Sequence, residues 1–141
     1  MVTLRVSGAN FDVDAFLNDS SLTPAIVFRR DELKVPGHTR NSSGMNVSVS
    51  DAEFGDLARQ TRDALEFLNT NREEVERLVN YVGVEGVELD FPVYGKDAFV
   101  ESYRFSPELL ERVGHLGIEL CVSRYVRPED ATQQIVGREP R

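Results

Sequence analysis

Segments of this chain alternate apolar and polar residues with a period of two, the pattern of a β-strand that buries only one face. The apolar members are Val2, Leu4 and Val6, then Met45, Val47 and Val49, then Val87, Leu89, Phe91 and Val93. Strands of a parallel sheet that is covered on both faces would instead be apolar throughout. The alternation therefore predicts an α+β fold, in which helices pack on one face of a mostly antiparallel sheet.

Capping signals predict the helices that cover this sheet. The clearest signal is Ser-Asp-Ala-Glu at residues 50–53, a capping box that predicts a helix over residues 51–69. Leucines follow it at helical spacing. The other expected caps are Asp12, Asn71 and Ser106, and the expected helix ends are Gly83 and Gly117.

The segments between these elements divide into strands and loops. Residues 25–28 and 118–122 are expected strands, and residues 99–105 are an expected partner strand for the segment around Pro92. Pro92 lacks an amide hydrogen, which indicates an edge position or the end of its strand. The polar residues 31–44 predict a long loop, which is either functional or mobile.

The length of 141 residues fits one ordinary domain. Residues 127–141 are polar and have no apolar period, so we expect a single domain over residues 1–126 followed by a flexible tail. Neither a signal peptide nor an apolar run of the ~20 residues needed to span a bilayer is visible. With one cysteine, Cys121, these features predict a cytoplasmic protein without a membrane partner.

The charge balance narrows the class of partner. Lys and Arg total 16 and Asp and Glu total 24, which gives a net charge of −8. Nucleic-acid binding depends on clustered Lys and Arg that neutralise phosphates, so this balance argues against a nucleic-acid partner. It favours a basic macromolecular partner instead.

Two blocks of the sequence resemble a known family. The first is Thr-Leu-Arg-Val-Ser-Gly at residues 3–8, followed by Phe-Asp at 11–12 and Phe-Leu at 16–17. The second is Phe-Ser-Pro-Glu-Leu-Leu at 105–110, followed by Leu-Gly-Ile-Glu-Leu at 116–120 and Ser-Arg-Tyr at 123–125. Together they resemble a family of small bacterial domains of unknown function, over roughly residues 2–125. The resemblance implies this fold and a bacterial cytoplasmic setting, and it supplies no catalytic residue.

Catalytic patterns are weak. Cys121 is expected in a strand, and His115 precedes it across a helix end, a spacing that shows neither hydrogen-bond reach nor a lowered thiol pKa. His38 and His115 are far apart, and no spacing typical of metal ligands exists. We therefore predict no catalytic residue, no metal and no cofactor, and interpret Cys121 as structural.

The acidic residues predict a binding surface. Residues 84–101 carry five acids against one lysine, and residues 51–66 carry five acids against two arginines. Complementary charge would speed encounter with a basic protein partner, and aromatic side chains would anchor it. The expected binding residues are Glu88, Asp90, Tyr94, Phe99 and Tyr103.

A basic segment gives the alternative. Residues 29–40 carry four basic and two acidic side chains, a local charge of +2 in a chain of −8. Its candidate ligand residues are Arg29, Arg30, Lys34, His38 and Arg40. They would bind a small anionic ligand, in a binding or an enzymatic domain, or an acidic patch on a second copy. The preferred hypothesis is a non-catalytic interaction domain that binds a basic partner or associates with itself.

Overall fold

The computed structural model describes residues 1–95 and 99–127, without the side chain of Lys34. Within these residues the main sheet has five strands in the order β2-β5-β1-β6-β7. They are β1 (Val2–Gly8), β2 (Ile26–Phe28), β5 (Ser43–Ser50), β6 (Gly86–Tyr94) and β7 (Glu119–Tyr125). Neighbouring strands are antiparallel, except that β7 runs parallel to β6 after a helical crossover.

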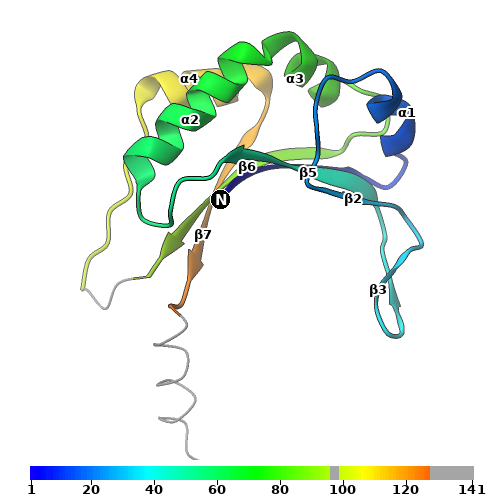
Figure 1. The fold of residues 1–141 in the computed structure, drawn as a ribbon, viewed down its shortest axis with the longest axis horizontal. Helices are drawn as coiled ribbons and strands as arrows, with labels where there is room; N and C mark the ends of the chain where they lie inside the picture. The colour runs from blue at the N-terminus through cyan, green and yellow to red at the C-terminus, as the bar shows by residue number, and fades with distance from the viewer. Residues whose placement is uncertain (96–98, 128–141) are drawn as a thin grey trace, which may run out of the picture.

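The helices lie on one face of this sheet (Figure 1), so the predicted α+β fold is confirmed. They are α1 (Val13–Asn18), α2 (Leu57–Thr70), α3 (Arg72–Val79) and α4 (Pro107–Leu116). Leu4 lies between Val47 and Leu89 in the register, and all three are buried beneath the helices. We call this side of the sheet the covered face. No helix of the described residues lies on the opposite side, the open face.

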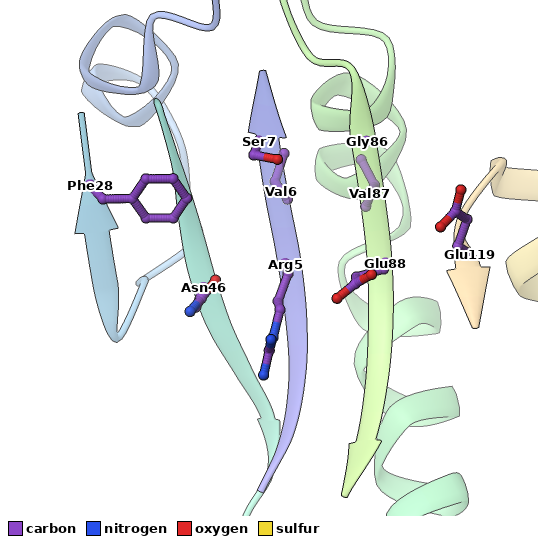
Figure 2. A pocket seen from close by; sticks show the side chains of 9 residues that line it. All are labelled: Arg5, Val6, Ser7, Phe28, Asn46, Gly86, Val87, Glu88 and Glu119. Atoms are coloured by element: carbon purple, nitrogen blue, oxygen red, sulfur yellow. The ribbon is translucent and has the colours of Figure 1, made fainter. Parts of the chain in front are cut away.

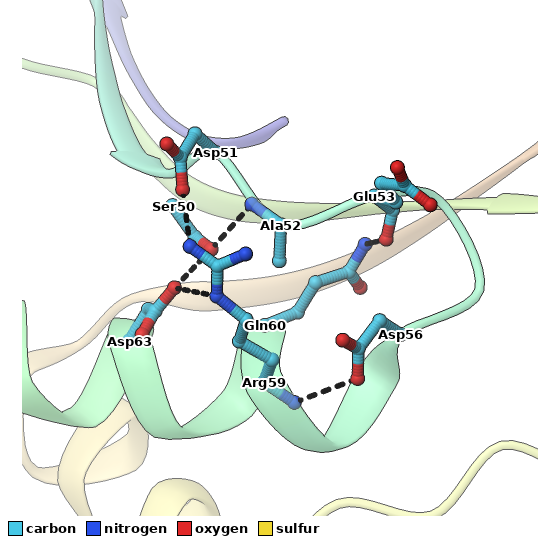
Figure 3. A network of polar contacts seen from close by, with 8 residues as sticks. All are labelled: Ser50, Asp51, Ala52, Glu53, Asp56, Arg59, Gln60 and Asp63. Carbon is cyan, nitrogen blue, oxygen red and sulfur yellow. Dashed lines mark hydrogen bonds and ion pairs between the residues drawn. The ribbon is translucent and has the colours of Figure 1, made fainter.

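The predicted start of the second helix is wrong. The helix α2 begins at Leu57, and its cap is Asp56, whose Oδ1 accepts from the Arg59 amide at 3.2 Å. Ser50 does not cap this helix. Its hydroxyl donates to Asp63 at 2.6 Å and accepts from the Ala52 amide at 3.1 Å (Figure 3). Gly55 has a positive φ of 94°, which ends any helix begun before it.

The long loop predicted over residues 31–44 is also wrong in part. It contains a hairpin of two short strands, β3 (Leu33–Val35) and β4 (His38–Thr39), and β5 already begins at Ser43. Strands of two or three residues are too short to show an alternation in the sequence. The hairpin projects away from the helices, on the side of the open face (Figure 1).

No strand forms over residues 99–105. The position beside β6 is taken by β7, and the segment leads into α4 with Phe105 packed against Phe91 at a centroid distance of 5.1 Å. As a result β6 is not an edge strand. Pro92 nevertheless lies beyond the Thr3–Asp90 pair, where the register with β1 stops. The proposed tail, apart from Arg127, lies outside the described residues.

Candidate functional site

The open face carries a shallow hollow of about 330 Å³, which lies across the strands where β6 and β7 begin (Figure 2). Alternate residues of adjacent strands line it, because every second side chain of a strand points away from the helices. The side chains that define its chemistry are Arg5, Ser7, Phe28, Asn46, Glu88 and Glu119. Most of these side chains are polar or charged, and one is an aromatic ring.

Phe28 lies across the sheet because residue 44 is a glycine. A Cβ atom at Gly44 would come within 2.6 Å of the Phe28 Cζ atom and 2.1 Å of the Val6 carbonyl oxygen. The Arg40 guanidinium stacks on the same ring, 4.5 Å from its centroid. This rim of the hollow thus already holds a cation against an aromatic surface.

Asp90 is the buried carboxylate of the open face, with 2% of the residue exposed. It accepts from Arg5 Nη2 at 3.0 Å and from the Ser123 hydroxyl at 2.5 Å. These contacts join β1, β6 and β7. A buried charge is tolerated when it is paired and hydrogen-bonded in this way, so Asp90 supports the sheet and holds the Arg5 guanidinium in place.

Glu88 and Glu119 supply the other carboxylates. They are partners in the parallel register of β6 and β7, and both line the hollow (Figure 2). Arg5 lies opposite Glu88 in the register, but its guanidinium is bonded to Asp90. Within residues 1–95 and 99–127, neither Glu88 nor Glu119 forms an ion pair. Two carboxylates on adjacent strands can bind a cation, such as the side chain of lysine or arginine.

The sequence-predicted binding residues do not all meet at the hollow. Glu88 and Asp90 share the open face, as their spacing predicts. The ring of Tyr94 packs against Phe54 at 4.8 Å, at the end of β6. The Phe99 side chain is fully exposed, and Tyr103 donates to Glu101 at 2.6 Å, a hydrogen bond that raises the pKa of the tyrosine.

The basic residues of the hairpin are also dispersed. Arg29 donates to both carboxylate oxygens of Asp14, at 2.8 and 2.7 Å, and these bonds lower the pKa of the Asp14 carboxyl. Arg30 donates to the Ala9 carbonyl at 3.4 Å, and His38 is exposed. The side chain of Lys34 lies outside the described part of the chain. The anionic-ligand hypothesis stays a prediction, and no convergence of these side chains supports it.

Cys121 lies on the open face, beside Asp90 in the register and 3.9 Å from the Ser123 hydroxyl. Burial raises the pKa of its thiol, which opposes the formation of a nucleophilic thiolate. His115 belongs to α4, on the covered side of the sheet. In the ranges that the structure describes, no three His, Cys, Asp or Glu side chains are grouped to hold a metal ion.

Sequence reasoning missed part of this site. Arg5, Phe28, Asn46 and Glu119 come from strands other than β6, and their proximity to Glu88 depends on strand order and register. The sequence feature that could have found them is the alternation itself. Polar residues such as Arg5 and Asn46 lie between buried apolar residues, so they share the face of Glu88 once the strands are aligned.

The fold and the site define a one-sided α+β domain, with a helix-covered face and a polar open face. The chain belongs to the family described as Domain of unknown function (DUF4279), whose sequence model matches residues 1–127. The resemblance to a family of domains of unknown function is thereby confirmed, while the bacterial setting stays a prediction. Searches of curated proteins and of solved structures find no match. None of the described helices has the length and apolar character to cross a membrane.

Proposed function

We propose that this domain acts by binding, and that it recognises a basic segment of a protein partner at the open face. The observation that carries the proposal is that Glu88 and Glu119, register partners on adjacent strands, both line a hollow of a sheet face that no described helix covers. On a flat surface two such carboxylates would only be solvated. Here Glu88 and Glu119 line a hollow that can accept a side chain of a partner.

The chemistry of the hollow fits the side chain of a lysine or arginine. Its charged head would bind between Glu88 and Glu119 through charge-assisted hydrogen bonds. The apolar stem would pack along Phe28, and Asn46 and Ser7 would offer hydrogen bonds to the backbone of the partner. Asp90 contributes indirectly, because it holds Arg5 at the border of the site.

The charge of the site favours the same class of partner. The charged side chains on the strands of this face are Arg5, Glu88, Asp90 and Glu119, and Arg40 lies at the rim of the hollow, so two bases stand against three acids. Such a surface attracts basic segments and repels acidic ones, and it acts mainly on the association rate. The acidic-surface hypothesis thus keeps Glu88, adds Glu119 and gives Asp90 a supporting role. Tyr94, Phe99 and Tyr103 stay predicted anchors of a larger interface.

A synthetic peptide with alternating lysine and valine tests the proposal. Its affinity for the protein is measured by calorimetry at low and high salt, and its position is mapped by changes in backbone amide NMR signals. The variant Glu88→Gln/Glu119→Gln is expected to bind about tenfold more weakly, since it loses two charge-assisted contacts. Binding by the wild type should weaken as salt rises.

The matched control is Glu66→Gln/Glu111→Gln. These exposed glutamates lie on α2 and α4, on the covered side, and the substitution changes the net charge by the same amount. The control should bind the peptide as the wild type does. Equal weakening in both variants would show attraction to net charge alone, and would contradict a site at the open face, as would a wild type that does not bind the peptide.

A further inference from the structure

The hairpin that interrupts the predicted loop is exposed along its length, since every residue of 29–39 whose burial is described is exposed. We call residues 29–40, with strands β3 and β4, the basic arm. The arm forms a separate two-stranded sheet, and it exposes 73% of Leu33 and 51% of Val35. An isolated two-stranded hairpin is marginally stable in water, and neighbouring apolar side chains exposed on it indicate a contact surface.

The direction of the arm decides what it can contact. It leaves the sheet at the β2–β5 side and projects beyond the open face, away from all four described helices (Figure 1). At its base, Arg40 stacks on Phe28, so the arm begins at the rim of the hollow. A partner that approaches the open face therefore meets the arm as well.

The arm and the open face have opposite charge. The arm carries four basic and two acidic residues, and Arg29 is paired with Asp14 outside the arm, which leaves three basic residues against two acidic ones. The open face has Arg5 against Glu88, Asp90 and Glu119. One chain thus contains both a basic projection with apolar side chains and an acidic hollow, on the same side of the sheet. A surface that carries both members of a complementary pair can bind a copy of itself around a two-fold axis.

We propose that the basic partner is a second copy of this chain, and that two copies associate open face to open face, with the basic arm of each against the acidic hollow of the other. This inference rests on the proposed function, because it names the partner of the same site. The association would cover Leu33 and Val35 and would bring arm cations to Glu88 and Glu119 of the opposite copy. The two contacts are equivalent by symmetry.

Charge exchange between arm and face tests the arrangement. The arm variant is Arg30→Glu/Arg40→Glu, and the face variant is Glu88→Lys/Glu119→Lys. Sedimentation velocity over a concentration series should show a dimer for the wild type at low salt and a monomer for each variant alone. In each variant, arm and face have charge of the same sign, which opposes association.

An equimolar mixture of the two variants gives the decisive measurement. Each arm then faces a hollow of opposite charge on the other variant, so the mixture should form a heterodimer although neither variant associates alone. Glu66→Lys/Glu111→Lys, with charge reversal on the exposed covered side, should dimerise like the wild type. Leu33→Ser/Val35→Ser leaves the charges intact and should still weaken the dimer by tenfold or more, at about 1.4 kcal/mol for each factor of ten.

The outcomes separate this inference from the proposed function. If the wild type stays monomeric at all concentrations but still binds the lysine–valine peptide at the open face, the partner is a different basic protein and the inference is overturned. A dimer that persists in both charge-reversed variants uses another surface, and this also overturns it. If the protein dimerises as described but does not bind the peptide, the association of two copies stands, whereas the proposed recognition of basic segments in general is contradicted.

Discussion

The covered and open faces of the sheet are built from alternate residues of the same strands, and they are stabilised in different ways. On β6, Leu89 is 0% exposed and packs in the core, whereas its neighbour Glu88 lines the hollow on the other side. The covered face is stabilised by the removal of apolar surface from water, which is non-directional. The open face depends on Asp90, whose contacts with Arg5 and Ser123 are directional.

This difference assigns stability and recognition to separate sides of one sheet. A substitution on the covered face changes how well the helices fit and therefore changes the fold. A substitution at the rim of the hollow changes charge and hydrogen bonding at a surface, with little effect on the core. Asp90 is the exception, because it lies on the open face but is buried, so its substitution is expected to affect stability.

The largest effect is expected from a pair of neighbouring substitutions on β6. Leu89→Ala should lower the free energy of unfolding by about 2–5 kcal/mol, because it removes buried atoms and leaves a cavity beneath the helices. Glu88→Ala, one residue away, should change it by less than about 0.5 kcal/mol. Urea denaturation of both variants measures the difference. Similar losses in the two variants would show that the two faces do not differ in this way.

A smaller loss of unfolding free energy is expected for a substitution of Asp90, the buried carboxylate of the open face. Asp90→Ala removes the acceptor of the Arg5 and Ser123 hydrogen bonds, and should lower the free energy of unfolding by about 1–3 kcal/mol. The loss stays below that of Leu89→Ala because the Arg5 side chain is 43% exposed and can be hydrated when its partner is lost. The same urea titration checks the order of the two effects. Ser123→Ala, which removes only one of these bonds, is the control and should cost about 0.5–1.5 kcal/mol.

Much of this fold could be predicted from the sequence. The alternation around Leu4, Val47 and Leu89 correctly predicts a sheet with one buried face, because burial of alternate residues is what the period of two expresses. The start of α2 could not be predicted in the same way. The capping box at residues 50–53 is a local pattern, and tertiary contacts override it, since Ser50 binds Asp63 and Phe54 packs against Tyr94.

The candidate site was predictable only along one strand. Because side chains alternate along a strand, Glu88 and Asp90, two residues apart, are expected on the same face, and the structure agrees. Burial of Asp90 depends on Arg5 and Ser123, which lie 85 and 33 residues away in the chain, so it required the strand order. The position of Phe28 over Gly44 required the pairing of β2 with β5. Local patterns give the face of a residue, whereas register gives its neighbours.

The smallest effect concerns Cys121, on the open face. Burial raises the pKa of its thiol, so the folded protein should react with a disulfide reagent more slowly than the unfolded protein at pH 8. The reaction rate of the folded protein should continue to rise at a pH where the rate of the unfolded thiol has levelled off. Measurement of both rates over a pH series, in buffer and in urea, checks this. Equal reaction rates of the folded and unfolded protein at pH 8 would contradict a raised pKa of the Cys121 thiol.

The raised pKa of Cys121 also determines the direction in which the stability of the protein changes with pH. Because the folded pKa of Cys121 lies above the unfolded value, its contribution to the free energy of unfolding is complete below the unfolded pKa. It is lost as pH rises through the folded pKa, since the unfolded state then releases the proton more readily. In Cys121→Ser this part of the alkaline decline should vanish, while stability at neutral pH and binding at the open face stay close to those of the wild type. If the substitution instead abolished binding in a folded protein, the thiol would belong to the recognition surface, and the distinction between Cys121 and the carboxylates of the hollow would be wrong.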